Sequence, residues 1–466
     1  ARRGRQRRNM GERVGLPTEL ADALAGYVSA FDVTRLPPRV VERTVELSIS
    51  AIGAAVRGAT MPITARVASY ARSQGGRPEA AVIGLGFATS IELAGMLNCI
   101  ACHETEYEDV AWPEAQYTCC LIPAAFTIGE ATGASGADVI AAIVAGTEVA
   151  GRPVIDGRAG AQSRGFLGSA VFGTLGAAAA AGRFLKLGPD DLRQALCIAA
   201  STAAGLLRQS GSDAHVMEPG FAARNGIAAA MLAARGLGGN PGILEGPGSL
   251  YDAILGHHNV GFAPPEEAGD YRVMAVGQKK YPCGYHLQRI LDPLLDFIAR
   301  EDLHADDIEE IVLHTGPGFA RTVRYLDPAT PDEARLSLGY VIGAAVCRRA
   351  VDFRSFTAAA LNDPAVRATR DKIRHIVHGQ ESARPFSSAD RLELVLIDGR
   401  RFEAECRSAH GDPDDPLTRE ETIAKYRLCV GRLLPAAKTR QVLTMLCNLA
   451  DLPEVGGMMR LLSENT

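Results

Sequence analysis

The sequence lacks any apolar run of about 18 residues, the length at which a transmembrane helix becomes possible. It also lacks a hydrophobic stretch after the arginine pairs of residues 1–8, so neither a secretory nor a twin-arginine signal is visible. These absences predict a cytoplasmic protein without a membrane partner. Because charge runs usually stay in water, we interpret ARRGRQRR at the start as a solvated extension rather than a basic arm.

An excess of basic residues is missing as well. The chain has 49 Lys and Arg against 54 Asp and Glu, which gives a formal net charge of −5. Nucleic-acid-binding domains usually carry a strong basic surface, so no nucleic-acid partner is expected. Hydrophobic residues at 47% and charged residues at 22% are ordinary for a globular protein, and 466 residues are enough for two domains.

The ten cysteines do not establish a metal or haem site. Cys99-x-x-Cys102-His103 matches the pattern that attaches a c-type haem, but that attachment requires export, for which no signal is visible. A zinc site needs a second clustered pair of ligands, and the adjacent Cys119 and Cys120 would point in different directions on a helix. We therefore expect reduced, mostly buried thiols and no metal site.

Residues 11–265 show helical periodicity, with apolar or small side chains at three- and four-residue spacing. Ser135 has the character of an N-cap, and Pro189 followed by two aspartates marks the start of another helix. Alanine and glycine are frequent on these helices, and small side chains let helix axes approach closely. This part of the chain predicts a closely packed all-helical domain.

The pattern changes near residue 271. Residues 308–314 form a β-rich run, and 391–406 alternates on both sides of Asp398-Gly399, which predicts a hairpin. Between them, the segment that begins at Thr330 and Pro331 predicts one helix.

A capping box at Thr418-x-x-Glu421 marks the return to helix. The predicted fold class is mainly α. Residues 1–270 and 409–466 form an all-helical large domain, and 271–408 form a smaller inserted α+β lid domain.

Several stretches, taken in order, resemble the MmgE/PrpD family. They are NCIACHETEYED (98–109), GFLGSAVFGTLGAAAAAGRFLKLG (165–188), MEPGFAARNGIAAAMLAARG (217–236), KKYPCG (279–284) and YLDPATPDEARLSLGYVIGAAV (325–346). The resemblance implies a helical domain, an α+β lid, a cleft between them and a homodimer. It also implies enzymes without an organic cofactor. These take a proton from a carbon beside a carboxylate and then lose water, lose carbon dioxide or return the proton.

The chain differs from the family pattern at chemically important positions. Family histidines correspond to Gln116, Leu167 and Gln288, and a family lysine corresponds to His215. His286, two residues before Gln288, could replace one of these histidines. A divergent family member with fewer cations in its cleft is therefore expected.

Eight residues are candidates for the site. The expected catalytic residues are Lys279, His215, His103 and Tyr281, and the expected substrate-binding residues are Glu106, Asp109, Ser169 and His286.

Each candidate has a simpler structural alternative. Lys279 would hold a carboxylate, or act as a base where burial lowers its pKa, unless it is a surface lysine. His215 would exchange a proton, unless it is a solvated loop histidine. Tyr281 would donate to an oxyanion or only pack. Ser169 would hold an anion at a helix start or merely cap it.

The acidic stretch that follows His103 corresponds to the family's Asp-x-Asp-Asp motif. His103, Glu106 and Asp109 are therefore expected at a cleft edge beside a helix end, although charged residues also collect at solvated helix ends. Three functions remain open. The first is a lyase on a small organic acid, and the second is an isomerase, epimerase or cyclase acting on a less anionic substrate in specialised metabolism. The third is a non-catalytic dimeric binding protein.

Overall fold

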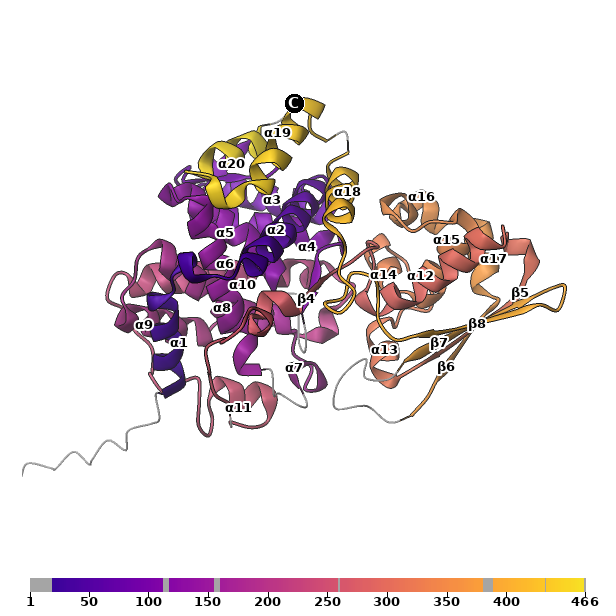
Figure 1. The fold of residues 1–466 in the computed structure, drawn as a ribbon, viewed down its shortest axis with the longest axis horizontal. Coiled ribbons are helices and arrows are strands. Elements are labelled where there is room, and N and C mark those ends of the chain that lie inside the picture. The colour runs from indigo at the N-terminus through magenta and orange to yellow at the C-terminus, as the bar shows by residue number, and fades with distance from the viewer. Residues whose placement is uncertain are drawn as a thin grey trace, which may run out of the picture.

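The computed structural model describes residues 19–111, 117–154, 160–258, 260–379, 389–431 and 433–464. The arginine-rich start and Gln116 lie outside these ranges. Helices dominate the larger lobe (Figure 1). Its first part contains α1 (Glu19–Ala30), α2 (Pro38–Gly58), α3 (Pro62–Gln74), α4 (Ile91–Glu104), α5 (Thr118–Thr132), α6 (Gly136–Gly151), α7 (Gly160–Ser163), α8 (Gly168–Phe184), α9 (Pro189–Ala200), α10 (Asp213–Ala233) and α11 (Leu250–Leu255).

The helix starts follow the capping signals of the sequence. The Ser135 side chain accepts a hydrogen bond from the backbone of Asp138, and the two residues form a capping box at the start of α6. Pro189 occupies the first turn of α9. Thr418 and Glu421 form the predicted capping box. These predictions are confirmed.

Small residues allow the long helices to pack closely, as expected. A Cβ added at Gly146 of α6 would lie 2.8 Å from the carbonyl oxygen of Gly176 on α8. One added at Gly226 of α10 would lie 2.6 Å from the carbonyl oxygen of Thr174. Both distances are shorter than a carbon–oxygen contact allows, so α6, α8 and α10 depend on glycine where they meet.

The smaller lobe holds a four-stranded sheet with helices packed against it (Figure 1). The strand order is β6 (Ile373–Val377), β5 (Ile308–Thr315), β7 (Asp390–Leu396) and β8 (Arg401–Cys406). The β7–β8 pair is the predicted hairpin. Its turn contains Gly399 at a φ of 89°, a left-handed conformation that glycine adopts readily. The helices are α12 (Tyr285–Arg300), α13 (Pro317–Thr322), α14 (Pro331–Arg335), α15 (Leu338–Arg348), α16 (Ala358–Leu361) and α17 (Pro364–Arg370).

The single helix predicted from Thr330 onward is wrong in one respect, because the chain forms two helices there. α14 ends at Arg335, and Ser337 then accepts a hydrogen bond from the Tyr340 amide at 3.3 Å as the N-cap of α15. A serine can offer its hydroxyl to a new helix start as easily as it can continue a helix, which explains the break.

The two largest hydrophobic clusters of the described residues form the cores of the two lobes. The smaller core draws its buried residues from Tyr281 to Cys406. The larger core extends through Val276 and resumes at Tyr426. It includes residues of the C-terminal helices α18 (Arg419–Val430), α19 (Ala436–Cys447) and α20 (Gly456–Ser463). The mainly α fold with an α+β region is therefore confirmed.

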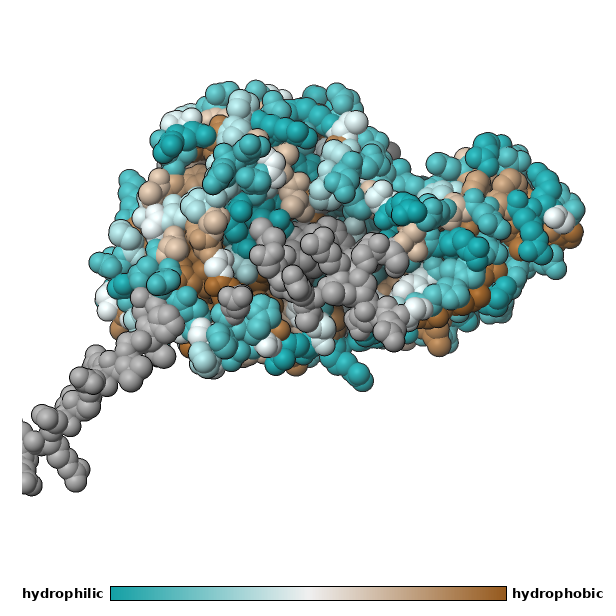
Figure 2. Space-filling view, turned by 60° about the horizontal axis from the view of Figure 1, so that its bottom comes forward, coloured by the Kyte–Doolittle hydropathy of each residue, from teal (hydrophilic) through white to brown (hydrophobic). Residues whose placement is uncertain are grey.

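The surface drawn in Figure 2 is mostly hydrophilic, with apolar residues scattered over both lobes. Among the described residues, none of the helices combines the length and the apolar character needed to cross a bilayer. Apart from the short hairpin of β1 (Ala80–Val82) and β2 (Phe87–Thr89), the larger lobe holds one further pair of short strands, which positions the candidate site.

This pair is an antiparallel ribbon of β3 (Asp109–Ala111) and β4 (Val276–Gln278). Asp109 pairs with Gln278, and Val110 pairs with Gly277. The ribbon places the acidic stretch after α4 beside the segment through which the chain enters the smaller lobe.

Candidate active site

Lys279 lies directly after β4 and is only 1% exposed. Its amide donates to the carbonyl oxygen of Glu108 at 3.2 Å, which extends the ribbon by one residue. Its Nζ atom lies 2.7 Å from Glu106 Oε2 and 3.1 Å from Glu108 Oε1. Lys279 is therefore part of a buried ion-pair cluster and not a surface lysine.

His103 lies in the last turn of α4 and is fully buried. Its Nδ1 atom is 3.0 Å from Glu108 Oε1 and 3.9 Å from Cys119 Sγ. Among the residues that the structure describes, its Nε2 atom has no hydrogen-bond partner. His103 is thus oriented by Glu108 through one ring nitrogen, and its other nitrogen is a buried polar atom without a described partner.

His215 enters the cluster from the first turn of α10, which Ser212 caps. Its Nε2 atom lies 3.5 Å from Glu106 Oε1, and its Nδ1 atom lies 3.6 Å from Glu218 Oε2. Its ring contacts the ring of His103 edge to face, with a centroid distance of 4.9 Å. Three segments far apart in the sequence therefore meet at Glu106.

The neighbouring glutamates raise the pKa values of both histidines in this cluster. Burial opposes charge on His103, but the Glu108 carboxylate raises the pKa of His103 to about 10. Burial also opposes charge on His215, yet the nearby carboxylates of Glu106 and Glu218 raise its pKa to about 9. Both shifts favour the protonated, cationic form of the imidazole.

The pKa values of the two glutamates and of Lys279 are shifted in the directions that favour their charged forms. Burial would raise the pKa of Glu106, but the Lys279 ammonium and His215 hold it well below its usual value. In the same way, Lys279 and His103 lower the pKa of Glu108 against the effect of its burial. The pKa of Lys279 is raised because both glutamates outweigh its burial. Lys279 is therefore a fixed cation, which argues against the expected alternative of a lysine base.

Glu106 has a strained backbone. Its φ of 50° lies in the left-handed region, which non-glycine residues seldom adopt. Such strain persists only where surrounding contacts enforce it, and it gathers at functional sites. The ion pair with Lys279 supplies one enforcing contact.

Asp109 is buried beside the cluster in β3. Neither of its carboxylate oxygens has a hydrogen-bond partner from another described residue. Burial, together with the nearby charge of Glu108, raises the pKa of Asp109 to about 7. Asp109 can therefore exchange a proton near neutral pH.

The remaining sequence candidates lie outside the ion-pair cluster. Tyr281 donates to Asp292 Oδ1 at 2.7 Å, so its hydroxyl faces α12. The ring of His286 packs against Phe319, and burial lowers the pKa of His286 to about 3. Ser169 is buried near the start of α8, and its Oγ has no partner among the described residues.

Two of the family histidine positions have structural roles in this chain. Gln288 Oε1 accepts from the amides of Lys280 and Tyr281, and its Nε2 donates to the Tyr281 carbonyl oxygen at 2.9 Å. Gln288 thus holds the KKYPC loop in shape. Leu167 is buried before α8, and its amide donates to the Gly205 carbonyl oxygen at 3.1 Å.

Besides Glu218, which lies next to His215, two further residues outside the eight candidates belong to the cluster. Glu108 belongs to the acidic stretch that followed His103, so its type and position were visible in the sequence. Lys425 on α18 had no such signal. Its Nζ atom donates to the carbonyl oxygens of Glu108 at 3.1 Å and Lys279 at 2.7 Å.

One atom each from His103, Glu106 and His215 lie within 4.8 Å of one another, close enough to share a metal ion. In this chain, however, the Lys279 ammonium already bonds to Glu106, and both imidazoles hold protons. An added cation would therefore compete with Lys279 for Glu106 and with protons for the two imidazoles.

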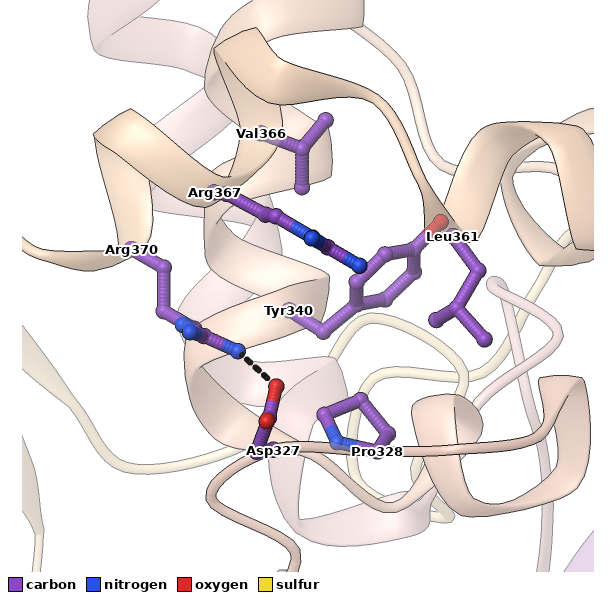
Figure 3. Close-up of a pocket in the computed structure, with 7 residues that line it drawn as sticks. All are labelled: Asp327, Pro328, Tyr340, Leu361, Val366, Arg367 and Arg370. Carbon is purple, nitrogen blue, oxygen red and sulfur yellow. Dashed lines mark hydrogen bonds and ion pairs between the residues drawn. The ribbon is translucent and has the colours of Figure 1, made fainter.

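The smaller lobe closes over the loop that precedes α10. Tyr325 donates to the Ser210 carbonyl oxygen at 2.6 Å, and Arg324 donates to the same oxygen at 2.8 Å. A separate depression in the smaller lobe lies between Asp327, Tyr340 and Arg370 (Figure 3) and has about 10 Å³ of free space. An ion pair between Arg370 and Asp327 crosses this depression, which lies apart from the Lys279 cluster.

Comparison with known proteins identifies the family of this chain. The sequence matches the MmgE/PrpD N-terminal domain over residues 22–263 and the MmgE/PrpD C-terminal domain over residues 281–450. The chain belongs to the MmgE/PrpD family. Two mammalian relatives are cis-aconitate decarboxylases. The one from Mus musculus is 26% identical over 461 residues, covering 95% of this chain and 93% of the relative.

The cis-aconitate decarboxylase of Homo sapiens is also 26% identical, over 95% of this chain and 94% of the relative. A cis-aconitate decarboxylase-like protein of Aspergillus oryzae is 25% identical over 94% of this chain and 96% of the relative. With the family match, these relatives confirm the expectation of an enzyme of the lyase type. At such identities the chain is a divergent member.

Proposed function

We propose that this MmgE/PrpD protein is a decarboxylating lyase that protonates a carbanion with an imidazolium of its buried cluster. The observation that carries the proposal is the pair of histidines 4.9 Å apart, each held as a cation by a glutamate. Decarboxylation requires a proton donor after the carbon–carbon bond breaks, and an imidazolium is a suitable general acid.

In the proposed reaction, the bond between a carbon atom and its carboxylate breaks and carbon dioxide leaves. The electron pair stays on the carbon, next to a group that can spread the charge. His103 Nε2, which has no partner among the described residues, then donates its proton to that carbon, and the neutral imidazole regains a proton from solvent. Glu108 holds His103 through Nδ1 at 3.0 Å and stabilises its cationic form.

Lys279 has an electrostatic role in this scheme. Its ammonium, within 3.1 Å of both glutamates, keeps them ionised and so keeps both histidines charged. A fixed buried cation also stabilises negative charge that develops on the substrate. The supporting lobe contacts at Ser210 would exclude water from the carbanion while the lid is closed.

The charge balance of the site bears on the substrate. Within the described residues of the cluster, Lys279, His103 and His215 each already contact a glutamate carboxylate. Little unpaired positive charge remains to hold several substrate carboxylates. This supports an acid with fewer carboxylates than the tricarboxylate that gives the mammalian relatives their name.

An isomerase or epimerase is the second candidate, and Asp109 is the observation that favours it. With a pKa of about 7, Asp109 can take a proton from carbon as well as return one. Both imidazoles are protonated and both glutamates are weak bases, so Asp109 is the group in the cluster best suited to proton abstraction.

The test is conversion of a panel of small mono-, di- and tricarboxylic acids, cis-aconitate included, in deuterium oxide with NMR and mass detection. The proposal predicts loss of carbon dioxide with one deuterium gained at carbon. Deuterium exchange without loss of mass would support the isomerase, and loss of water would indicate a dehydratase. No change in any acid would favour a binding protein and contradict the proposal.

A further inference from the structure

The strongest feature without an assigned role is a buried lysine, Lys425, which contacts the backbone of Glu108 and Lys279. Lys425 lies on α18, and the C-terminal part of the chain brings it to the end of the β3–β4 ribbon. We propose, on the basis of the function above, that Lys425 is a positioning residue whose ammonium ties together the backbone of Glu108 and Lys279. The single group thereby fixes the spacing of the ion pair that orients His103.

Lys425 contacts the two residues whose side chains form the ion pair beside His103, namely Glu108 and Lys279. Its Nζ atom donates to the carbonyl oxygens of Glu108 and Lys279, whose own backbone pair is 3.2 Å long. Beyond this pair the ribbon has no further regular ladder bond, since β3 starts at Asp109 and β4 ends at Gln278. The ammonium therefore holds the ribbon at the end where Glu108 and Lys279 leave it.

Placing a lysine at this buried position costs desolvation free energy. Lys425 is 4% exposed, and no carboxylate of the described residues lies within salt-bridge distance of its Nζ atom. Burial lowers the pKa of Lys425 to about 8, and an apolar residue would avoid the desolvation of a cation. Compensation comes from two carbonyl dipoles and from the ring of Tyr107, whose centroid lies 4.4 Å from Nζ.

The helix that carries Lys425 packs against α2 and contacts the ribbon at β4. On α2, a Cβ added at Gly53 would lie 3.1 Å from Tyr426 Cδ2, so α18 and α2 are in close contact there. The Gln278 side chain donates to the Thr422 hydroxyl at 3.3 Å. Lys425 therefore reaches the ribbon from a fixed base, which positioning requires.

The charged groups around Lys425 would respond to its loss. Glu108 and Asp109 attract its ammonium, Lys279 repels it, and Cys429 lies beside it on α18. Removing the ammonium releases the Glu108 backbone and deprives Glu108 and Asp109 of a nearby cation. The consequence closest to the chemistry is a weaker hold of Glu108 on His103.

The test compares Lys425→Met and Lys425→Gln with Lys438→Met. Lys438 lies on α19 and pairs with Glu464, so it controls for loss of a C-terminal lysine. Two readouts are needed in folded protein: the pKa of His103 by NMR of labelled histidines, and kcat and KM for the acid that the wild type converts. Met cannot donate, and the shorter Gln side chain does not reach both carbonyls.

We expect both Lys425 variants to lower the pKa of His103 by about one unit or more and kcat by about 10-fold or more, with KM changed less than about threefold. Lys438→Met should match the wild type. The NMR readout needs no substrate, so it remains decisive if no acid in the panel is converted. A folded variant of either kind with wild-type kcat, or with an unshifted His103 where turnover is absent, would overturn the proposal.

Discussion

At the residue scale, Glu106 is the point where the cluster is joined. One oxygen bonds to Lys279 and the other lies 3.5 Å from His215, while the backbone adopts a left-handed φ. Neutralising this carboxylate would remove the partner that keeps His215 charged and half of the anionic charge that faces Lys279. Its loss should therefore affect turnover more than the loss of a single hydrogen bond.

Glu106→Gln is predicted to lower kcat by about 100-fold or more, the usual size of a lost acid–base contribution. Glu92→Gln, in the first turn of α4, is the control and should leave kcat unchanged. Steady-state kinetics on folded protein measure both variants. A Glu106→Gln enzyme with wild-type kcat would remove Glu106 from the mechanism.

Asp109 gives a prediction about stability and pH. Its folded pKa is raised, so the native state binds this proton more tightly than the unfolded state does, and stability falls as pH rises from about 4 towards 7. Asp109→Asn imitates the neutral form. We expect its Tm to exceed that of the wild type by roughly 2 °C or more at pH 8 and the gap to close at pH 5.

Differential scanning fluorimetry across this pH range checks the sign of the Asp109 effect. Asp138→Asn, at the exposed capping box of α6, is the control for loss of a carboxylate at a helix start. A Tm difference between Asp109→Asn and the wild type that grows toward pH 5 would show that Asp109 is not held neutral by burial.

Residue types could be read from the sequence, but side-chain direction could not. Lys279 and Tyr281 belong to the same short motif, yet Lys279 enters the cluster while Tyr281 bonds to Asp292. The Gln288 side chain shapes the loop between them, a contact that no local pattern reveals. Lys425 is the extreme case, since its role depends on two carbonyl groups contributed by other segments.

At the element scale, the β3–β4 ribbon determines where the site forms. Its strands have three residues each, too short for a β pattern to identify, and they come from widely separated parts of the chain. The longer hairpin of β7 and β8 was predictable because its turn and alternation are local. Short-range signals thus gave the helices, the caps and the hairpin, while the ribbon required tertiary contacts.

Gly411→Ala tests the importance of the ribbon. Gly411 has a φ of 112°, and an added Cβ would lie 2.1 Å from the Gln278 carbonyl oxygen, so the ribbon would have to shift. Gly236→Ala is the control, because its φ of 80° is also left-handed but nothing lies within 4 Å of an added Cβ. The control should cost about 1–2 kcal/mol from backbone strain alone.

Gly411→Ala should cost clearly more than the control and should also reduce kcat, because Gln278 directly precedes Lys279. Chemical denaturation and steady-state kinetics measure the two effects. Equal losses in the two variants would mean that the ribbon tolerates displacement and does not position the cluster.

At the scale of the whole molecule, the site lies where the chain passes from one hydrophobic core to the other. The larger core includes Val276, and the smaller core begins at Tyr281, so Lys279 stands between them. The contact of Tyr325 with Ser210 closes the smaller lobe onto the loop before α10. The site therefore lies next to the contact between the two lobes.

The most direct measurement compares conversion rates of Lys279→Met and Lys280→Met, using the acid that the wild type converts. Lys280 is the neighbouring lysine, and its ammonium bonds to Asp292 instead of the cluster. We predict that Lys279→Met loses about 1,000-fold in rate, while Lys280→Met stays within about threefold of the wild type. Wild-type rates in a folded Lys279→Met enzyme would contradict the central claim that this buried ion-pair cluster performs the chemistry.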